Sequence, residues 1–435
     1  MNRQTHALEL SAYEKTLIPD STSVNVLTLR HSDQIPFKWV EDGQSSVASH
    51  GYASEISYDH IFSHGRSMKI LLLQQKERFA VSDSSISTLF SSYAKRMLRL
   101  SMAHSFLNHH FEAGCGFADG IGLDYLKLNY SHDWNKYSLR IGLTSERHSW
   151  QFKVAEGMEH IPVRVDQILT QVGLGVSIYP AWGKLLIDVS HNVPHSLSLE
   201  HSNTLWMLLD PYRSGIDIQY TLPLGQLGDL SMFYSNRIDT CNSKIMDEST
   251  IIGKIYAFDN REEQVGFELN IGIIDPGLSF HRYRGELRGQ VLAGHFGGLL
   301  TQLSGARYFQ QLQAEMEVLK LFFDAHSSIG KLFELRIKNS LLQGRGKLYS
   351  RHHVFQLFNP LTDLSIQEYD IKRMILNEVE AWFQMGIAPK ILISVTGGYL
   401  IPLKLEIETH PVTKINTAEL KLGARMGFQI QYIFD

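Results

Sequence analysis

The last stretch of the chain carries the clearest alternation of hydrophobic and polar positions. Every second residue there is apolar: Leu420, Leu422, Ala424, Met426, Phe428, Ile430, Tyr432 and Phe434. Most of the residues between them are polar, charged or glycine. Because successive side chains of a strand point to opposite faces, this pattern predicts one long β-strand with an apolar and a polar face.

The same alternation recurs along the chain. Further apolar faces are predicted in residues 137–143, 150–154, 172–178, 216–222, 265–273, 379–387 and 403–407. Many of these segments exceed the usual strand of about five or six residues. A strand that crosses a membrane needs about 9–11 tilted residues, with aromatic residues near its ends. The pattern therefore favours a membrane β-barrel.

Two segments also fit a helical spacing of apolar residues. They are residues 309–319 and 371–379. Each also fits an alternating strand, and the flanking segments alternate cleanly, so we expect strands in both. Short polar breaks at 132–133 and 275–277 indicate turns, whereas 239–249 indicates a longer loop.

At its carboxyl end the chain resembles Gram-negative outer-membrane β-barrel proteins. Phe428, Tyr432 and Phe434 stand where such barrels place the aromatic residues of their assembly signal, although the chain ends in Asp435 and the glycine is at Gly427. The resemblance implies an all-β, transmembrane antiparallel β-barrel in the outer membrane of a Gram-negative bacterium, with its signal peptide removed. It also implies contact with outer-membrane lipid and with the barrel-assembly machinery.

The resemblance covers residues 48–435, which we assign to the barrel. At the strand length above, that span allows about 18 strands, within a range of roughly 16–22. A barrel of about 16–18 strands leaves a water-filled lumen unless something plugs it. Residues 1–47 alternate less regularly, so they are expected to be an N-terminal arm, a plug, a periplasmic segment or further strands.

The most unusual charged positions alternate along one predicted strand. Arg282, Arg284, Glu286 and Arg288 share one face, with Tyr283 and Leu287 on the other. We expect the charges to face the lumen as an anion-attracting or sugar-guiding strip. The alternative is an ordinary charged lumen wall, balanced by neighbours such as Glu315 and Glu317, which are also expected to face the lumen.

Composition and motifs narrow the function classes. With 41 Lys+Arg and 45 Asp+Glu, the net charge of -4 argues against nucleic acid as a partner. The chain has 20 His but no metal-binding spacing, and it has no nucleotide-binding motif. We therefore expect no catalytic residues, no metal site and no cofactor. Cys115 and Cys241 could form one bridge or remain two unpaired thiols.

Three functions remain open at this stage. The first is a porin-like channel for polar solutes or an exported polymer. The second is a closed or plugged barrel that anchors protein partners in a membrane complex. The third is a soluble all-β protein whose apolar faces form an interior. A hydrolase embedded in the barrel is less favoured, because the sequence has no Gly-x-Ser-x-Gly motif.

Overall fold

A computed structural model describes most of the chain from residue 24 onward. The described residues are 24–35, 38–41, 45–62, 65–82, 89–118, 123–156, 159–180, 182–193, 205–247, 250–253, 256–292, 307–329, 333–356, 359–388, 390–410, 418–421 and 423–434. Side chains are described in 24–33, 51–62, 65–76, 96–118, 123–147, 168–180, 182–193, 212–240, 259–286, 313–328, 333–349, 368–388, 390–408 and 423–434.

The described chain is almost entirely strand. The strands are β1 (Val24–Ile35), β2 (Lys38–Glu41), β3 (Ser45–Phe62), β4 (Arg66–Ser82), β5 (Leu89–Phe106), β6 (His109–Ala118), β7 (Leu123–Trp134), β8 (Tyr137–Glu156), β9 (Glu159–Ile178), β10 (Lys184–Val193), β11 (Leu205–Pro223), β12 (Asp229–Asp247), β13 (Thr250–Gly253), β14 (Tyr256–Asn270), β15 (Ile274–Leu292), β16 (Arg307–Ile329), β17 (Phe333–Gln356), β18 (Asn359–Ala388), β19 (Ile391–His410), β20 (Ala418–Lys421) and β21 (Gly423–Phe434). One short 3-10 helix, η1, spans Gly225–Leu227. Within the described ranges, no helix is long and apolar enough to cross a bilayer.

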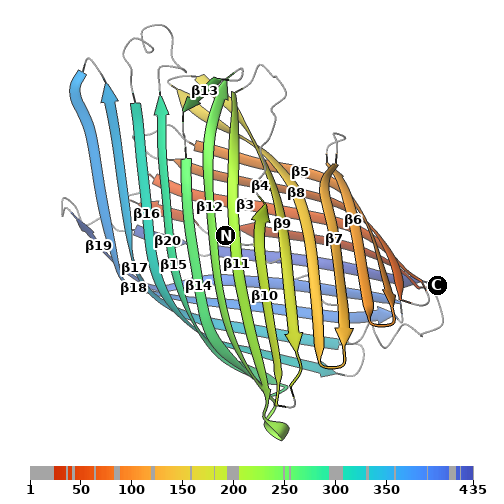
Figure 1. The fold of residues 1–435 in the computed structure, drawn as a ribbon. Helices are drawn as coiled ribbons and strands as arrows, with labels where there is room; N and C mark the ends of the chain where they lie inside the picture. Colours follow the sequence, from red (N-terminus) through yellow and green to blue (C-terminus); the bar gives the residue numbers. More distant parts are fainter. Residues whose placement is uncertain are drawn as a thin grey trace.

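The strands form a closed antiparallel ring (Figure 1). Each long strand pairs with the next along the chain, and β1 pairs with β21 to close the sheet, from Asn25↔Phe434 to Ile35↔Ala424. The short strands β2, β13 and β20 add pairings to this wall. The ring therefore has 18 strands, as the sequence predicted.

The amino-terminal boundary of the barrel differs from the expected residue 48. Strand β1 lies within the segment assigned to an arm, plug or further strands, and it pairs along its length with both β3 and β21. Its apolar Leu27 and Leu29 alternate with the polar Thr28 and Arg30, which is the pattern of a wall strand. Residues 1–23 lie outside the described residues, and their role as an arm or plug stays a prediction.

The two ends of the barrel differ in their connections. At the end where β1 begins and β21 finishes, successive strands are joined by short links such as 107–108, 135–136 and 271–273. At the opposite end the intervals between strands vary: they are long between Val193 and Leu205 and between Leu292 and Arg307, and short between Glu156 and Glu159. This asymmetry matches membrane barrels, whose turns are short on the periplasmic side and whose loops are longer on the outer side. We call these the turn end and the loop end.

The two segments with a possible helical spacing are strands. Residues 309–319 lie in β16, which pairs with β15 and β17, and residues 371–379 lie in β18, between β17 and β19. In β18 the ladder shifts register near Ile371 and near Ile375. A β-bulge of this kind adds an unpaired residue and disturbs strict alternation, which explains the ambiguous spacing.

The side chains sort into two faces. One face carries large apolar residues that stay exposed, such as Leu29, Ile56 and Leu72 at 39%, 47% and 51%. These three are neighbours across β1, β3 and β4. On the other face, the most completely buried described side chains are small and polar: Asn192, Ser57, Ser279 and Ser340. A soluble sandwich would bury its apolar face, so this arrangement is the reverse of the soluble hypothesis.

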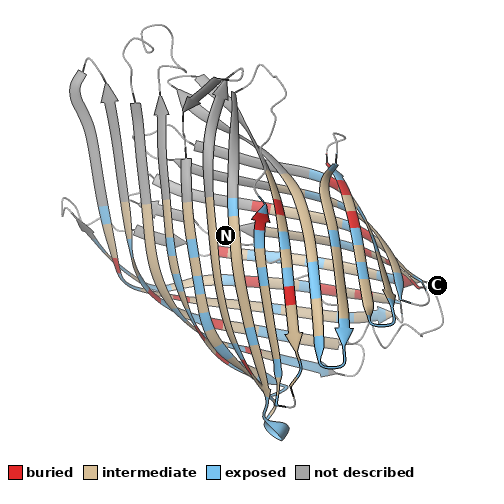
Figure 2. Cartoon of the chain, in the orientation of Figure 1, coloured by how far each residue is buried: buried red, intermediate tan, exposed pale blue. Residues whose placement is uncertain are grey.

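Ion pairs identify the polar face as the inside of the ring. The Arg140–Asp188 pair reaches across β9, and the Lys320–Glu378 pair reaches across β17. Side chains two strands apart converge on the concave side of a sheet and diverge on its convex side. The polar face is therefore the lumen face, and the apolar face is the outward face. In Figure 2 exposed residues recur along the described length of the strands, as expected of a wall rather than a solid core.

Candidate functional site: the lumen wall

Basic and acidic side chains on the lumen face are largely paired. The pairs, with their nitrogen–oxygen distances, are Lys69–Asp59 at 3.3 Å, Lys127–Glu112 at 2.6 Å, Arg213–Asp239 at 2.8 Å, Arg237–Asp217 at 3.4 Å and Lys320–Glu378 at 3.2 Å. They occur on both halves of the ring, and no sector of the described lumen wall carries cations alone. The wall is polar and close to electrically balanced.

One pair crosses two intervening strands. The guanidinium of Arg99 on β5 lies 4.1 Å from the ring centroid of Tyr125 on β7 and bonds Glu146 on β8 at 2.7 Å. Gly116 on β6 lies between them, and a Cβ there would approach both Arg99 and Tyr125 to 3.0 Å. The glycine leaves room for the arginine to lie flat along the wall.

A shallow hollow opens in the lumen wall between β7 and β11. Its floor is glycine: Gly142 pairs with Gly173 across β8 and β9, and Gly175 follows on β9. Its rim holds polar side chains: Asn129, Arg140, Thr144, Gln171, Asp188, Ser190 and Asp217. Its volume is about 270 Å³. We call this the glycine hollow; it offers hydrogen-bond donors and acceptors of both charges to a polar solute.

The Arg140–Asp188 pair depends on that glycine floor. Gly175 lies between them in the ladder, opposite Arg140 on β8 and Asp188 on β10. A Cβ at Gly175 would collide with the Asp188 carboxylate and press against the Arg140 guanidinium. The missing side chain at Gly175 therefore makes room both for the hollow and for the Arg140–Asp188 pair at its rim.

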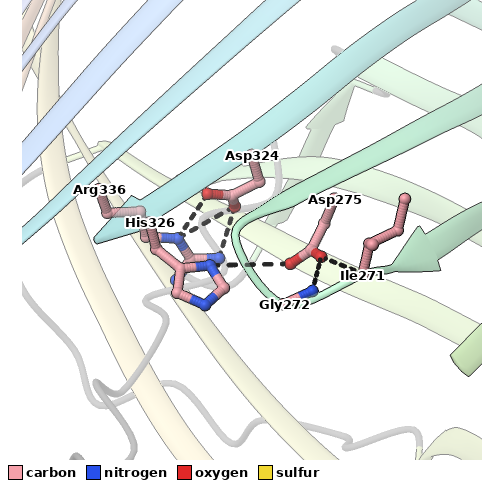
Figure 3. Close-up of polar contacts among 6 residues, drawn as sticks. All are labelled: Ile271, Gly272, Asp275, Asp324, His326 and Arg336. Carbon is pink, nitrogen blue, oxygen red and sulfur yellow. Dashed lines mark hydrogen bonds and ion pairs between the residues drawn. The ribbon is translucent and has the colours of Figure 1, made fainter. Parts of the chain in front are cut away.

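A second polar cluster stiffens the turn end of the lumen (Figure 3). The Asp275 carboxylate accepts hydrogen bonds from the backbone N–H groups of Ile271 at 2.8 Å and Gly272 at 3.3 Å, and Oδ2 lies 3.8 Å from His326 Nδ1. Gly272 has φ of +108°, which a residue with a side chain rarely adopts. The carboxylate thus caps the β14–β15 turn.

Beside it, Arg336 holds a buried carboxylate. Its Nε donates to both oxygens of Asp324, at 2.8 and 3.0 Å, and its terminal nitrogen donates to Oδ2 at 2.5 Å (Figure 3). The Asp324 side chain is 5% exposed, whereas that of Arg336 is 57% exposed. This two-pronged contact joins β16 to β17 at the lumen mouth.

The charged strip on β15 is outward, contrary to the expectation from the sequence. Arg282 and Arg284 alternate in step with Leu278 and Phe280, and the ladder continues their face to Glu317 and Glu315 on β16. That face also carries exposed Leu319, Leu321 and Phe323. Glu286 shares the face by alternation, while Arg288 lies on β15 beyond the described side chains. The lumen side of this strand is instead Ser279, His281 and Tyr283.

The carboxyl-terminal aromatic residues sit on the outward face at the closing seam. Phe428 and Tyr432 are 47% and 43% exposed, and the rings of Tyr432 and Phe434 are stacked with centroids 5.4 Å apart. Phe434 also lies 6.4 Å from the ring of Tyr58 on β3. Their position fits an assembly signal, which stays a prediction.

Sequence reasoning identified part of this wall and missed the rest. The polar partners of the 137–143 and 172–178 ribbons include Arg140, Gly142, Gly173 and Gly175, all on the lumen face. Asp188 was missed because the apolar run of residues 185–187 hides the alternation of β10. Among the described residues, no group of His, Cys, Asp or Glu is arranged to hold a metal ion. Cys115 is a free thiol on β6.

Comparisons with known proteins yield only distant structural matches. The chain is similar to OccK7 of Pseudomonas aeruginosa, with 12% identity, 95% of this chain and 99% of that chain covered, and a TM-score of 0.42. OccAB3 of Acinetobacter baumannii shows 10% identity, 95% and 99% coverage, and 0.41. An anion-selective porin from Comamonas acidovorans shows 9% identity, 95% and 99% coverage, and 0.36. No protein-family model and no curated protein matches the chain.

The geometry by itself defines the class. A closed ring of 18 antiparallel strands, an apolar outward face and a polar lumen face are the architecture of Gram-negative outer-membrane β-barrels. Lipid offers no hydrogen-bond partners to an open sheet edge, and the β1–β21 pairing leaves none. The chain therefore has the fold of a transmembrane β-barrel.

Proposed function

We propose that this barrel is a channel for polar solutes across the outer membrane. The observation that carries the proposal is the lumen face: polar, ion-paired and lined by the glycine hollow, inside a ring of 18 strands. Rings of about this size enclose an aqueous passage. Such a passage needs polar walls but no chemistry, so the proposal includes no catalytic step.

The near balance of lumen charge limits the solute class. Paired arginines and carboxylates offer hydrogen bonds to both donors and acceptors without a strong field of one sign. The glycine hollow adds Asn129, Thr144 and Gln171 as neutral contacts. This supports small, polar solutes of low net charge rather than a dedicated anion path.

Reconstitution in planar bilayers tests the proposal. The full chain, refolded until its band shifts on an unheated gel, is expected to give discrete, long-lived conductance steps in potassium chloride. A folded, heat-modifiable barrel that remains electrically silent would contradict the channel.

A plugged anchor for partner proteins is the second candidate, and one observation favours it. Val24, Val26, Leu392 and Ile433 form an apolar cluster on the lumen face, each at most 9% exposed. Covering an apolar cluster on a water-facing wall is favourable, so these residues would favour the docking of an apolar segment inside the lumen. The discriminating variant lacks residues 1–23: a plug predicts that deletion opens a silent barrel, whereas an open channel predicts conductance in both forms.

A further inference from the structure

One sector of the lumen wall is apolar. We call it the lumen apolar strip: Met316 and Val318 on β16, Leu342 on β17, and Ile371, Met374 and Leu376 on β18. In the ladder Lys320 lies opposite Leu342, and Leu342 lies opposite Leu376. The strip therefore shares the face of Lys320 and Glu378, whose ion pair across β17 identifies that face as the inside of the ring.

The strip continues onto β19 without a change in character. Leu405 lies opposite Met374, and Ile407 lies opposite Ile371. Ile371 and Leu376 are 4% and 8% exposed. With about 4.8 Å between neighbouring strands, four strands make the apolar sector roughly 14 Å wide. The interior of a membrane barrel is normally polar, so an apolar sector of this width departs from the common architecture.

Two glycines on β17 form the floor of the strip. A Cβ at Gly344 would approach the Met374 methyl group to 2.9 Å and a Val318 methyl group to 3.3 Å. A Cβ at Gly346 would approach Met316 Cγ to 2.9 Å. The missing side chains leave a narrow apolar floor along β17, against which methionines lie from both neighbouring strands. Methionine is unbranched, flexible and polarisable, so it adapts its shape to an apolar ligand.

Toward the turn end, the strip stops at a set of paired charges. We call it the charge belt: Lys320, Glu378, Glu380 and Arg425, with side chains 21–53% exposed. The lysine lies 3.2 Å from Glu378, and the arginine lies 3.4 Å from Glu378 and also pairs with the second glutamate. Beyond the belt Arg336 pairs with Asp324, which lies opposite Lys338. Cations and carboxylates alternate here, so the belt offers hydrogen bonds of both kinds without a strong field of one sign.

We infer that the lumen apolar strip and the charge belt together bind an uncharged amphiphile, an unbranched alkyl chain with a hydroxyl-bearing head group. The strip is aliphatic throughout, so it fits an alkyl chain and offers no aromatic ring for stacking a sugar. The balanced belt complements a head group without net charge, because an ionised head would meet a like charge beside each opposite one. The inference goes beyond the proposed channel: binding needs access to the lumen but no ion conduction.

Photo-crosslinking of the folded full chain in phosphatidylcholine nanodiscs tests the site. The probe is decyl glucoside with a diazirine in its alkyl chain, and mass spectrometry of peptides locates the labelled residues. Probe dissolved in the lipid labels the outward face without saturation. We expect additional, saturable labelling of lumen-facing residues on β16 to β19. Labelling of outward residues alone would overturn the site, including the case in which a segment of the chain itself covers the strip.

Competition with unlabelled molecules tests the two halves of the amphiphile on the wild-type chain. Hexyl, octyl and decyl glucoside should compete for the lumen labelling in rising order, by roughly 4-fold for each methylene that is buried. Glucose, decanoate and decylammonium should compete less well than decyl glucoside. Equal competition by the three alkyl glucosides would overturn the role of the strip, and equal competition by decanoate or decylammonium would overturn the uncharged head.

The next residue on each strand provides a matched control. The strip variant carries Val318→Ser and Leu342→Ser, and the control carries Leu319→Ser and Leu341→Ser, on the outward face at 39% and 40% exposure. For preparations that show the gel shift of a folded barrel, the strip variant should need roughly 10-fold more decyl glucoside for the same competition. The control should match the wild type. Equal effects of the two variants, or no effect of the strip variant, would overturn the site.

Conductance recorded from the same preparations separates this site from the channel. A conducting barrel without saturable lumen labelling would overturn the site and leave the channel in place. A silent barrel with saturable lumen labelling would support the site and contradict the channel.

Discussion

At the scale of single residues, burial decides which half of an ion pair matters more. Asp324 and Arg336 make the same three contacts, yet the carboxylate is 5% exposed and the arginine side chain 57%. Removing the arginine leaves a buried, unpaired carboxylate, whereas removing the carboxylate leaves an arginine that water can still solvate.

We therefore predict that Arg336→Ala destabilises the barrel more than Asp324→Ala. The expected loss is about 3 kcal/mol for the first, near the lower end of the cost of breaking a buried pair, and less than about half of that for the second. Urea unfolding in vesicles, followed by the gel shift, measures both. Equal losses, or the reverse order, would show that burial does not control this pair.

The face of β15 on which Arg284 lies could be inferred only from its neighbouring residues. Tyr283 and Leu287 suggested an apolar face opposite the charges, but Leu278 and Phe280 lie on the same face as the arginines and continue the exposed apolar surface of β14 and β16. The polar residues Ser279 and His281 were the available signal in the sequence. The outward face of β15 is apolar in one part of the strand and charged in another. Alternation alone therefore assigns the charged residues to the lumen face or to the outward face, depending on which part of the strand is considered.

At the scale of elements, alternation predicted the wall strands well. The terminal ribbon is β21, and its outward Met426 and Phe428 are 66% and 47% exposed. Its first part is β20, separated from β21 at residue 422. The choice between helix and strand for β16 and β18 could be made only because flanking segments alternated. A single segment whose apolar residues fit both a helix and a strand does not reveal whether neighbouring strands pair with it.

We predict that the end of β21 governs assembly more than final stability. Tyr432→Ala with Phe434→Ala should lower the yield of folded barrel in the outer membrane several-fold. Both rings lie on the outward face, so refolding in detergent should be less affected. Leu29→Ala, an outward substitution on the adjoining β1, is the control. Normal insertion of the double variant in cells would remove these residues from the assembly signal.

At the scale of the whole molecule, ring closure separates inside from outside and decides which charges face the passage of the proposed channel. Arg140 and Arg284 are both exposed and both paired with acids, but only Arg140 faces the lumen. A charge on the outer wall is separated from the passage by the sheet and screened by water and salt over about 10 Å.

Reversal potentials across a salt gradient test this difference. Arg140→Glu should shift the wild-type preference toward cations, because it adds an unpaired acid beside Asp188 and Asp217. Arg284→Glu should leave the reversal potential within error of wild type. A larger shift for Arg284→Glu would place that residue in the passage and contradict the assigned faces.

The sequence by itself determined the class, because a wall between lipid and water must repeat the same two-residue period in every strand. It determined the strand number closely, since total length divided by strand length leaves little freedom. Only the tertiary structure decided which residues meet: the join of β1 to β21, the Arg140–Asp188 pair over Gly175, and the outward face of Arg284. Those contacts depend on the register between strands and on the curvature of the sheet. The alternation of residues within a single strand predicts neither of them.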